Sequence, residues 1–214
     1  AVPLVVGVAI AVVPMQLGAR SIAFPRLAIG GFWIWLFGAV ASIVALIGNG
    51  GPNGGNARFV DLFTLAVALS LVGLLASLVS VLTSILTTRA PGMNMRRLSA
   101  YSWSVLVMGV CAVLALPVLV GLLLYVYIAH KYPTISELSG NHALGQWVGF
   151  GFTHPTTVLF TIPIFGFAAD AVSTAAKRRL LPRGVVLATI GIIGIAVVGT
   201  SVQIPRSEEH TSEL

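Results

Sequence analysis

The sequence predicts an all-α fold, a polytopic bundle of transmembrane helices. Of its 214 residues, 57% are hydrophobic and only 8% are charged, and the mean hydropathy is +1.00. A soluble domain carries about 25% charged residues, so water cannot be the solvent for most of this surface. Several apolar runs reach the ~20 residues that are needed to cross a bilayer. Because no strict alternation of the barrel kind is present, the backbone in lipid must be satisfied within helices.

Six apolar runs divide the chain, and polar or Gly/Pro-rich segments typical of loops separate them. The longest runs have 28 or more residues. These exceed the ~20 residues of a perpendicular crossing, so we expect them to tilt or to protrude from the bilayer. The predicted helices cover approximately residues 1–16, 30–48, 60–87, 101–129, 143–176 and 184–204.

The basic residues alternate between loops in the manner of topology signals. The loops after the first, third and fifth runs hold nine Lys or Arg residues, and the intervening loops hold two. The positive-inside rule therefore places the nine on the cytoplasmic side. Because they are spread over loops, the formal charge of +6 does not indicate nucleic-acid binding. The nine are Arg20, Arg26, Arg89, Arg96, Arg97, Lys177, Arg178, Arg179 and Arg183, and the two are Arg58 and Lys131.

The two ends of the chain indicate an internal piece of a longer protein. Residues 1–13 read as the second half of a membrane helix, with no start methionine or signal peptide before them. Residues 206–214 (RSEEHTSEL) read as the in-frame translation of a common short-read sequencing adapter, and the composition changes abruptly at Pro205. We therefore expect one partial transmembrane domain over residues 1–205 and an artefact over residues 206–214.

Ionisable residues within apolar runs are candidates for function, because a polar group in hydrocarbon is expensive. Asp61 begins the third run, and we expect it to cap that helix and to interact with the helix dipole. Asp170 precedes the basic segment after the fifth run, where an ion pair with Lys177 or Arg178 is favoured over a role as a proton carrier. Cys111, the single cysteine, is predicted to serve helix packing.

Histidines are the other candidates. His130 ends the fourth run and His142 lies in the following loop, so both are predicted to lie at the membrane interface. His154 lies near the middle of the fifth run and is followed by Pro155, which removes a backbone donor and favours a kink. Two interpretations stay open: a buried histidine that donates to a freed carbonyl, or a metal ligand or proton-relay group.

A series of short motifs occurs here in the same order as in one known family. The motifs are VPMQLGARSIAFPRL at 13–27, VDL at 60–62, RAPGM at 89–93, WSVL at 103–106, LPVL at 116–119, HP at 154–155 and IPIFG at 162–166. Together they resemble subunit I of the haem-copper (cytochrome c) oxidases, collinearly over essentially all of residues 1–205. The resemblance covers the family's fold from about the end of its second helix to its seventh helix, out of twelve.

The resemblance implies a respiratory terminal oxidase of a bacterial cytoplasmic membrane. Such an enzyme transfers electrons from cytochrome c or quinol to O2 at a haem-copper centre, coupled to proton movement, and works with other oxidase subunits in the lipid bilayer. Haem and copper are the implied cofactors. His154 matches the family's copper-ligating histidine, whereas the family's haem ligands are expected outside this chain. No catalytic residue is assigned.

Several positions depart from the family pattern. Val158 stands where the family has a tyrosine cross-linked to a copper ligand, and Thr156 replaces a proton-channel glutamate. Ser21 replaces the aspartate at the mouth of that channel, and Ala28 lies where asparagines follow it. The histidine pair of the family's seventh helix falls on residues 203–204 or 200–201, and neither pair is histidine.

These departures leave a second function open. The chain is either part of a divergent oxidase or part of a degenerate homologue without a binuclear centre, with a structural or assembly role. A third class, an unrelated transporter, requires the collinear motifs to occur by chance.

Overall fold

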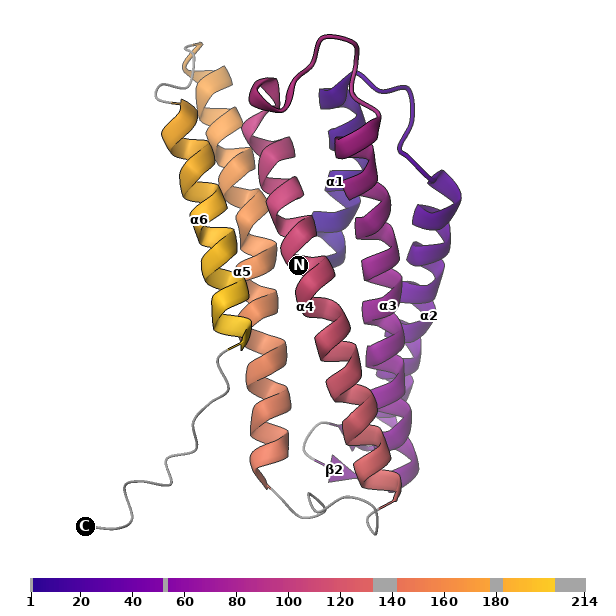
Figure 1. Cartoon of the computed structure of the whole chain (residues 1–214). Coiled ribbons are helices and arrows are strands. Elements are labelled where there is room, and N and C mark those ends of the chain that lie inside the picture. The colour runs from indigo at the N-terminus through magenta and orange to yellow at the C-terminus, as the bar shows by residue number, and fades with distance from the viewer. Residues whose placement is uncertain (1, 52–53, 133–141, 178–182, 203–214) are drawn as a thin grey trace, which may run out of the picture.

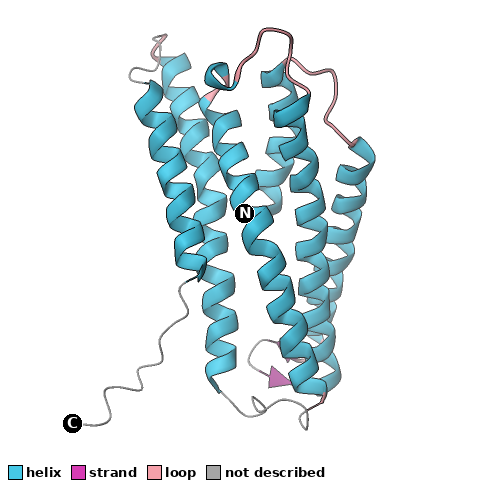
Figure 2. Ribbon diagram, in the orientation of Figure 1, coloured by secondary structure: helices cyan, strands magenta, loops and turns pink. Residues whose placement is uncertain are grey.

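The computed structural model describes residues 2–51, 54–132, 142–177 and 183–202, and it is almost entirely helical (Figures 1 and 2). Within these residues there are six α-helices, as the apolar runs predict. A 3-10 helix η1 (Met95–Arg97) precedes the fourth helix, and a short hairpin of β1 (Gly50–Gly51) and β2 (Gly54–Gly55) follows the second. The α-helices are α1 (Val2–Leu17), α2 (Pro25–Ile47), α3 (Ala57–Thr87), α4 (Ala100–Lys131), α5 (His142–Ala175) and α6 (Arg183–Val202).

The predicted boundaries differ from the observed ones mainly at the start of α2. The helix begins at Pro25 rather than near Gly30. Proline suits the first helical turn, where its missing N–H needs no partner and its fixed φ is already helical. Phe24, which precedes it, has φ 53, so the chain turns sharply through a left-handed conformation before α2 starts.

Consecutive helices run in opposite directions, and α4 lies centrally in the bundle (Figure 1). It contacts α1, α3, α5 and α6, whereas α2 packs at the edge against α3. The apolar core is contributed mostly by α1, α3 and α4, with fully buried side chains such as Leu17, Leu78, Ile85 and Met108. The fold therefore places α4 between the start of the described chain and the helix that carries His154.

Glycines allow α2 and α3 to approach closely. A Cβ atom on Gly73 would lie 2.3 Å from the backbone nitrogen of Trp35, and one on Gly38 would lie 2.7 Å from the carbonyl oxygen of Ala66. Small residues at helix contacts are typical of membrane bundles, where helices associate through close packing and interhelical hydrogen bonds.

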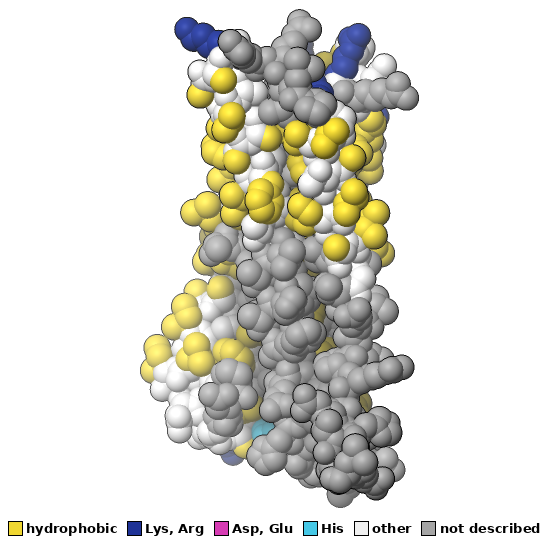
Figure 3. Space-filling view, turned by 90° about the vertical axis from the view of Figure 1, so that its left-hand side faces the viewer, with side chains coloured by type: hydrophobic (Ala, Val, Ile, Leu, Met, Phe, Trp, Pro, Cys, Tyr) yellow, Lys and Arg dark blue, Asp and Glu magenta, His cyan; other side chains and the backbone are white. Residues whose placement is uncertain are grey.

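The outer surface of the bundle is apolar. On the face shown in Figure 3, hydrophobic side chains make up much of the coloured surface between the two ends, and the Lys and Arg side chains lie at the ends. Among the described residues, α2, α3 and α4 are long and apolar enough to cross a membrane, and shorter apolar helices lie at 3–17, 159–175 and 183–196. The predicted transmembrane helix bundle is confirmed.

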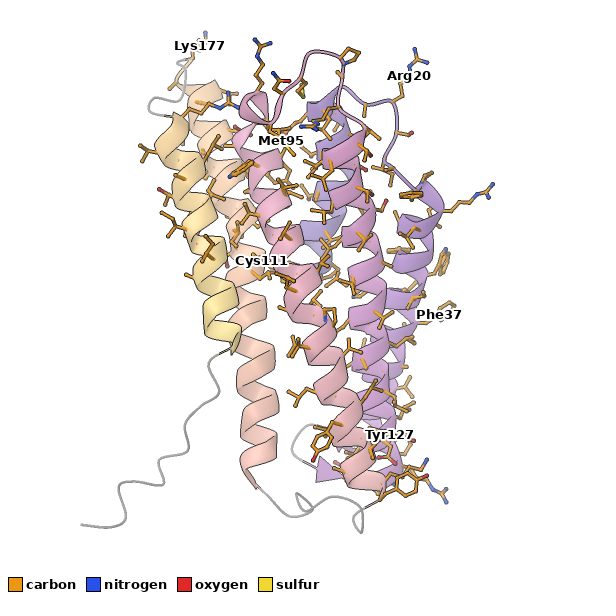
Figure 4. All side chains as sticks on the ribbon, viewed as in Figure 1. Arg20, Phe37, Met95, Cys111, Tyr127 and Lys177 are labelled. Atoms are coloured by element: carbon orange, nitrogen blue, oxygen red, sulfur yellow. The ribbon has the colours of Figure 1, made fainter. Side chains whose placement is uncertain are left out.

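The loops that are rich in Lys and Arg lie at one end of the bundle. We call the end of the bundle where α1, α3 and α5 finish and α2, α4 and α6 begin the basic end. Arg20 and Lys177, from two different connections, both lie there (Figure 4). Arg58 and Lys131 belong to the opposite end, at the start of α3 and the end of α4. That the basic end faces the cytoplasm stays a prediction.

Candidate functional site

His154 lies inside α5, which continues as one helix from His142 through Pro155 to Ala175. The side chains of residues 142–158 lie outside the described part of the structure. The two interpretations of His154, and the kink at Pro155, therefore stay predictions. His142 is the first residue of α5 rather than a loop residue. What the structure does describe is how the rest of α5 is held.

The second half of α5 is fitted closely onto the first half of α4. A Cβ atom on Gly166 would lie 2.7 Å from the carbonyl oxygen of Ala100. The rings of Tyr101 and Phe167 meet edge to face, with centroids 6.1 Å apart. Leu159 and Phe160 of the same helix are buried in the apolar core of the bundle. These contacts fix the rotation and the axial position of α5 relative to α4.

Asp170 lies at the basic end of this interface and caps α4. Its Oδ1 accepts a hydrogen bond from the Ala100 N–H at 3.1 Å, and its Oδ2 accepts one from the Tyr101 N–H at 2.9 Å. The first N–H groups of a helix have no partner within it and carry partial positive charge, so a carboxylate is stabilised there. The predicted ion pair with Lys177 is wrong: both carboxylate oxygens of Asp170 bind amides of α4, and the structure shows no ion pair between these two described residues. A pairing with Arg178 lies outside the described residues.

Side chains from two further helices, α1 and α6, bind the same turn. The Gln16 Oε1 of α1 accepts hydrogen bonds from the hydroxyls of Ser99 at 2.5 Å and Ser102 at 2.6 Å. The Ser99 hydroxyl in turn accepts from the Ser102 N–H at 3.1 Å, which makes Ser99 the N-cap of α4. The Arg183 guanidinium of α6 donates to the Leu98 carbonyl. Four helices therefore meet at residues 98–102, which we call the α4 junction.

Asp61 does not cap α3, contrary to the prediction. The helix begins at Ala57, and its N-cap is Asn56, whose Oδ1 accepts from the Arg58 N–H at 3.2 Å. Asp61 lies about one turn further in and pairs with His130 of α4, with 2.8 Å between Asp61 Oδ1 and His130 Nδ1. His130 is 41% exposed and lies next to the last residue of α4. The predicted helix start near residue 60 was too late. Asn56 follows a glycine-rich segment that is typical of a loop, so it was not recognised as the N-cap.

The connection before α2, where the resemblance places the mouth of a proton channel, is held by serines of α3. The Ser80 hydroxyl donates to the Ala23 carbonyl at 2.5 Å, and the Ser84 hydroxyl accepts from the Ala23 N–H at 2.7 Å. Ser21 itself is exposed, and Ala28 is buried at 4% exposure. The structure thus keeps the backbone of this region in place through hydroxyl groups, with no carboxylate at position 21.

Cys111 serves helix packing, as predicted. It is buried, and its thiol donates to the Gly194 carbonyl of α6 at 3.4 Å. Trp103 makes a similar contact between the same two helices, its indole N–H donating to the Leu187 carbonyl at 3.1 Å. Within the described ranges, no three His, Cys, Asp or Glu side chains gather closely enough to hold a metal ion.

A bundle of long apolar helices with polar connections defines the chain as a polytopic α-helical integral membrane protein. Its sequence matches the family described as Cytochrome C and Quinol oxidase polypeptide I over residues 1–202. The chain belongs to this family.

Bacterial relatives carry names of the same kind. The chain is 30% identical to the "Probable cytochrome c oxidase subunit 1-alpha" of Streptomyces coelicolor, a match that covers 92% of this chain and 37% of that protein. It is 31% identical to the cytochrome c oxidase subunit 1 of Corynebacterium efficiens (91% and 37%) and 29% identical to that of Bacillus subtilis (91% and 33%). The chain therefore spans about a third of the length of these relatives.

Proposed function

We propose that the chain is part of subunit I of a respiratory terminal oxidase, which transfers electrons from cytochrome c or quinol to O2 and couples this transfer to proton movement. The family match over residues 1–202, which includes the helix that bears His154, carries the proposal. The proposed protein works in a bacterial cytoplasmic membrane with other oxidase subunits. Residues 1–205 form its partial transmembrane domain, and residues 206–214 are foreign to it.

Haem and copper are the cofactors that this function requires. Protein copper sites need several converging ligands, and neutral imidazole suits them. Because the described part of the chain brings no three such groups together, it does not form a copper site by itself. We propose His154 as one ligand, with the remaining copper ligands and all haem ligands supplied from outside residues 1–205. When bound, the two metals would supply electrons to dioxygen.

Under this proposal the described residues position the ligand helix. The contacts of Asp170 and Gly166 with α4 fix the height of α5 in the bundle. His154 lies 16 residues before Asp170, which corresponds to about 24 Å along a straight helix at ~1.5 Å per residue. This spacing supports a position of His154 well inside the membrane, away from the basic end.

A second function is favoured by specific side chains. Ser21, Thr156 and Val158 stand where the family has two carboxylates and a tyrosine, and none of the three can carry a negative charge or a phenolic proton at neutral pH. These residues support a homologue that keeps the scaffold and has lost the binuclear centre. Such a protein would act in the structure or assembly of a respiratory membrane complex.

One set of measurements on the full-length protein separates the two functions. An oxidase shows haem bands in a reduced-minus-oxidised spectrum, contains copper and consumes O2. A protein without haem, or with one haem and no copper, supports the structural role instead. The intact gene gives the same answer earlier, because it either contains the haem-ligating histidines or lacks them.

The role of His154 is tested by comparison with a second histidine. His154→Ala is expected to remove copper and O2 consumption while the protein still inserts into the membrane. His130→Ala is the matched control, because His130 lies at the end of α4 and pairs with Asp61. Unchanged copper content in His154→Ala contradicts the ligand role.

A further inference from the structure

Helix α2 presents the most exposed apolar face of the bundle. Only 17% of its most apolar stretch is buried within the structure, against 50% for α3. Phe32, Trp33 and Phe37 project from this face with 49%, 51% and 63% of their surface exposed. Their rings are in contact, with centroids 5.9 Å apart for Phe32–Trp33 and 6.0 Å for Trp33–Phe37. Figure 4 shows Phe37 pointing away from the other helices.

Two arginines lie at the basic end of the same helix. Arg20 is in the connection that leads into α2, and Arg26 is in its first turn. Both side chains are exposed, and neither makes an ion pair or side-chain hydrogen bond to any residue that the structure describes. The first turn of α2 contains no acidic residue. These two charges are therefore not neutralised by the described part of the chain.

The other charged residues at the basic end do not neutralise Arg20 and Arg26 either. Asp170 is the one acidic residue that the described ranges place at the basic end, and its two carboxylate oxygens are engaged by backbone amides of α4. The Arg89 guanidinium donates to the Leu86 carbonyl of the preceding helix, α3, at 3.1 Å. Among the described residues, no free carboxylate therefore competes with an anionic group for Arg20 and Arg26.

We propose that the outer face of α2 binds an anionic phospholipid, with the headgroup phosphate at Arg20 and Arg26 and an acyl chain along Phe32 and Trp33. Trp33 lies eight residues after Pro25, about 12 Å along the helix at ~1.5 Å per residue, which is acyl-chain depth rather than headgroup depth. Arginine provides two parallel donors that suit a phosphate or other oxyanion. Basic residues at the membrane surface attract anionic lipids, and the apolar face supplies contact for the chain. This inference does not rest on the proposed oxidase function.

Fluorescence quenching of Trp33 tests the proposal directly. The full-length protein is reconstituted in phosphatidylcholine vesicles that contain a small fraction of a lipid with a dibrominated acyl chain, either phosphatidylglycerol or phosphatidylcholine. The emission of Trp33 is obtained as the difference between the parent protein and Trp33→Phe. We expect dibrominated phosphatidylglycerol to quench it at a several-fold lower mole fraction, by about fivefold for each arginine that contacts the headgroup.

Charge variants identify the source of the preference. Arg20→Gln combined with Arg26→Gln is expected to bring the ratio of the two quenching midpoints to about one. Arg58→Gln is the matched control, because Arg58 is an exposed arginine in the first turn of α3 at the opposite end of the bundle. Equal quenching by both lipids in the parent protein overturns the proposal. Absence of quenching by either lipid also overturns it, because protein rather than lipid would then cover α2.

Discussion

Removal of the Asp170 carboxylate is the most informative perturbation of the scaffold, because one side chain joins two helices. Asp170→Ala deletes hydrogen bonds to the N–H groups of Ala100 and Tyr101. Hydrogen bonds to a charged group are each worth about 1.5–3 kcal/mol, and loss of a helix N-cap costs about 0.5–2 kcal/mol. Ser99 still caps α4 through the Ser102 N–H, so part of the helix start remains satisfied. We therefore expect a loss of about 2–3 kcal/mol in the free energy of unfolding.

The measurement is an equilibrium unfolding titration of the full-length protein in mixed micelles, with helicity followed by circular dichroism. Asp170→Asn is expected to lose about half as much as Asp170→Ala, because one amide oxygen still accepts a hydrogen bond. Ser173→Ala is the matched control. Its hydroxyl donates only to the Asp170 carbonyl within α5, so the change should stay within about 0.5 kcal/mol.

The result that refutes the capping role is specific. If Lys177→Gln destabilises the protein as much as Asp170→Ala does, then Asp170 acts as an ion-pair partner of Lys177 and not as a cap. If Asp170→Ala is no worse than Ser173→Ala, then the two amide hydrogen bonds contribute nothing measurable. Either outcome removes the basis for assigning the register of α4 and α5 to this carboxylate.

Three further predictions use the same titration. Gly73→Ala should lower the free energy of unfolding by about 1–3 kcal/mol, because the added Cβ overpacks against α2. Gly121→Ala is the control, since a Cβ there meets nothing within 4 Å, and it should be neutral or slightly stabilising. Equal effects of the two changes would contradict the close contact of α2 and α3. Asn56→Ala should cost about 1 kcal/mol through loss of the α3 cap, and a smaller loss than for Asp61→Ala would return the capping role to Asp61. The pair of Asp61 with the half-exposed His130 should contribute no more than about 1 kcal/mol in a double-mutant cycle, and less at high salt.

The number and type of helices follow from the sequence because lipid solvation leaves few alternatives. An apolar run of ~20 residues can satisfy its backbone in a bilayer only as a helix, and the alternating Lys and Arg residues identify the turns between helices. The helix boundaries were less accurate at Pro25, since a proline and an arginine read as loop residues although both are compatible with a first helical turn. Local pattern thus predicts which elements form better than it predicts where each begins.

The partners of polar side chains were not predictable in the same way. Asp170 is separated by 70 residues from Ala100, and no local pattern indicates that an unsatisfied helix start will lie beside it. The nearby Lys177 suggested an ion pair, because side-chain charges can be read directly from the sequence. The partial positive charge at the N-terminus of another helix cannot be read in this way. Gln16 and Ser102 were missed for the same reason, although Ser99 before a long apolar run is a recognisable N-cap.

The contacts that hold the bundle explain how its chemistry can change while its fold persists. Asp170 and Trp103 bind backbone atoms of a neighbouring helix, and Ser80 binds a backbone atom of the connection before α2. These backbone atoms remain whatever side chain the neighbouring segment carries. Ser21, which the motif resemblance aligns with the family's channel aspartate, is exposed. Its identity can therefore vary with little effect on stability. A scaffold built on such contacts permits loss of reactive side chains without loss of family membership. For this chain, family membership therefore establishes the fold, and the oxidase function depends separately on the metals and on His154.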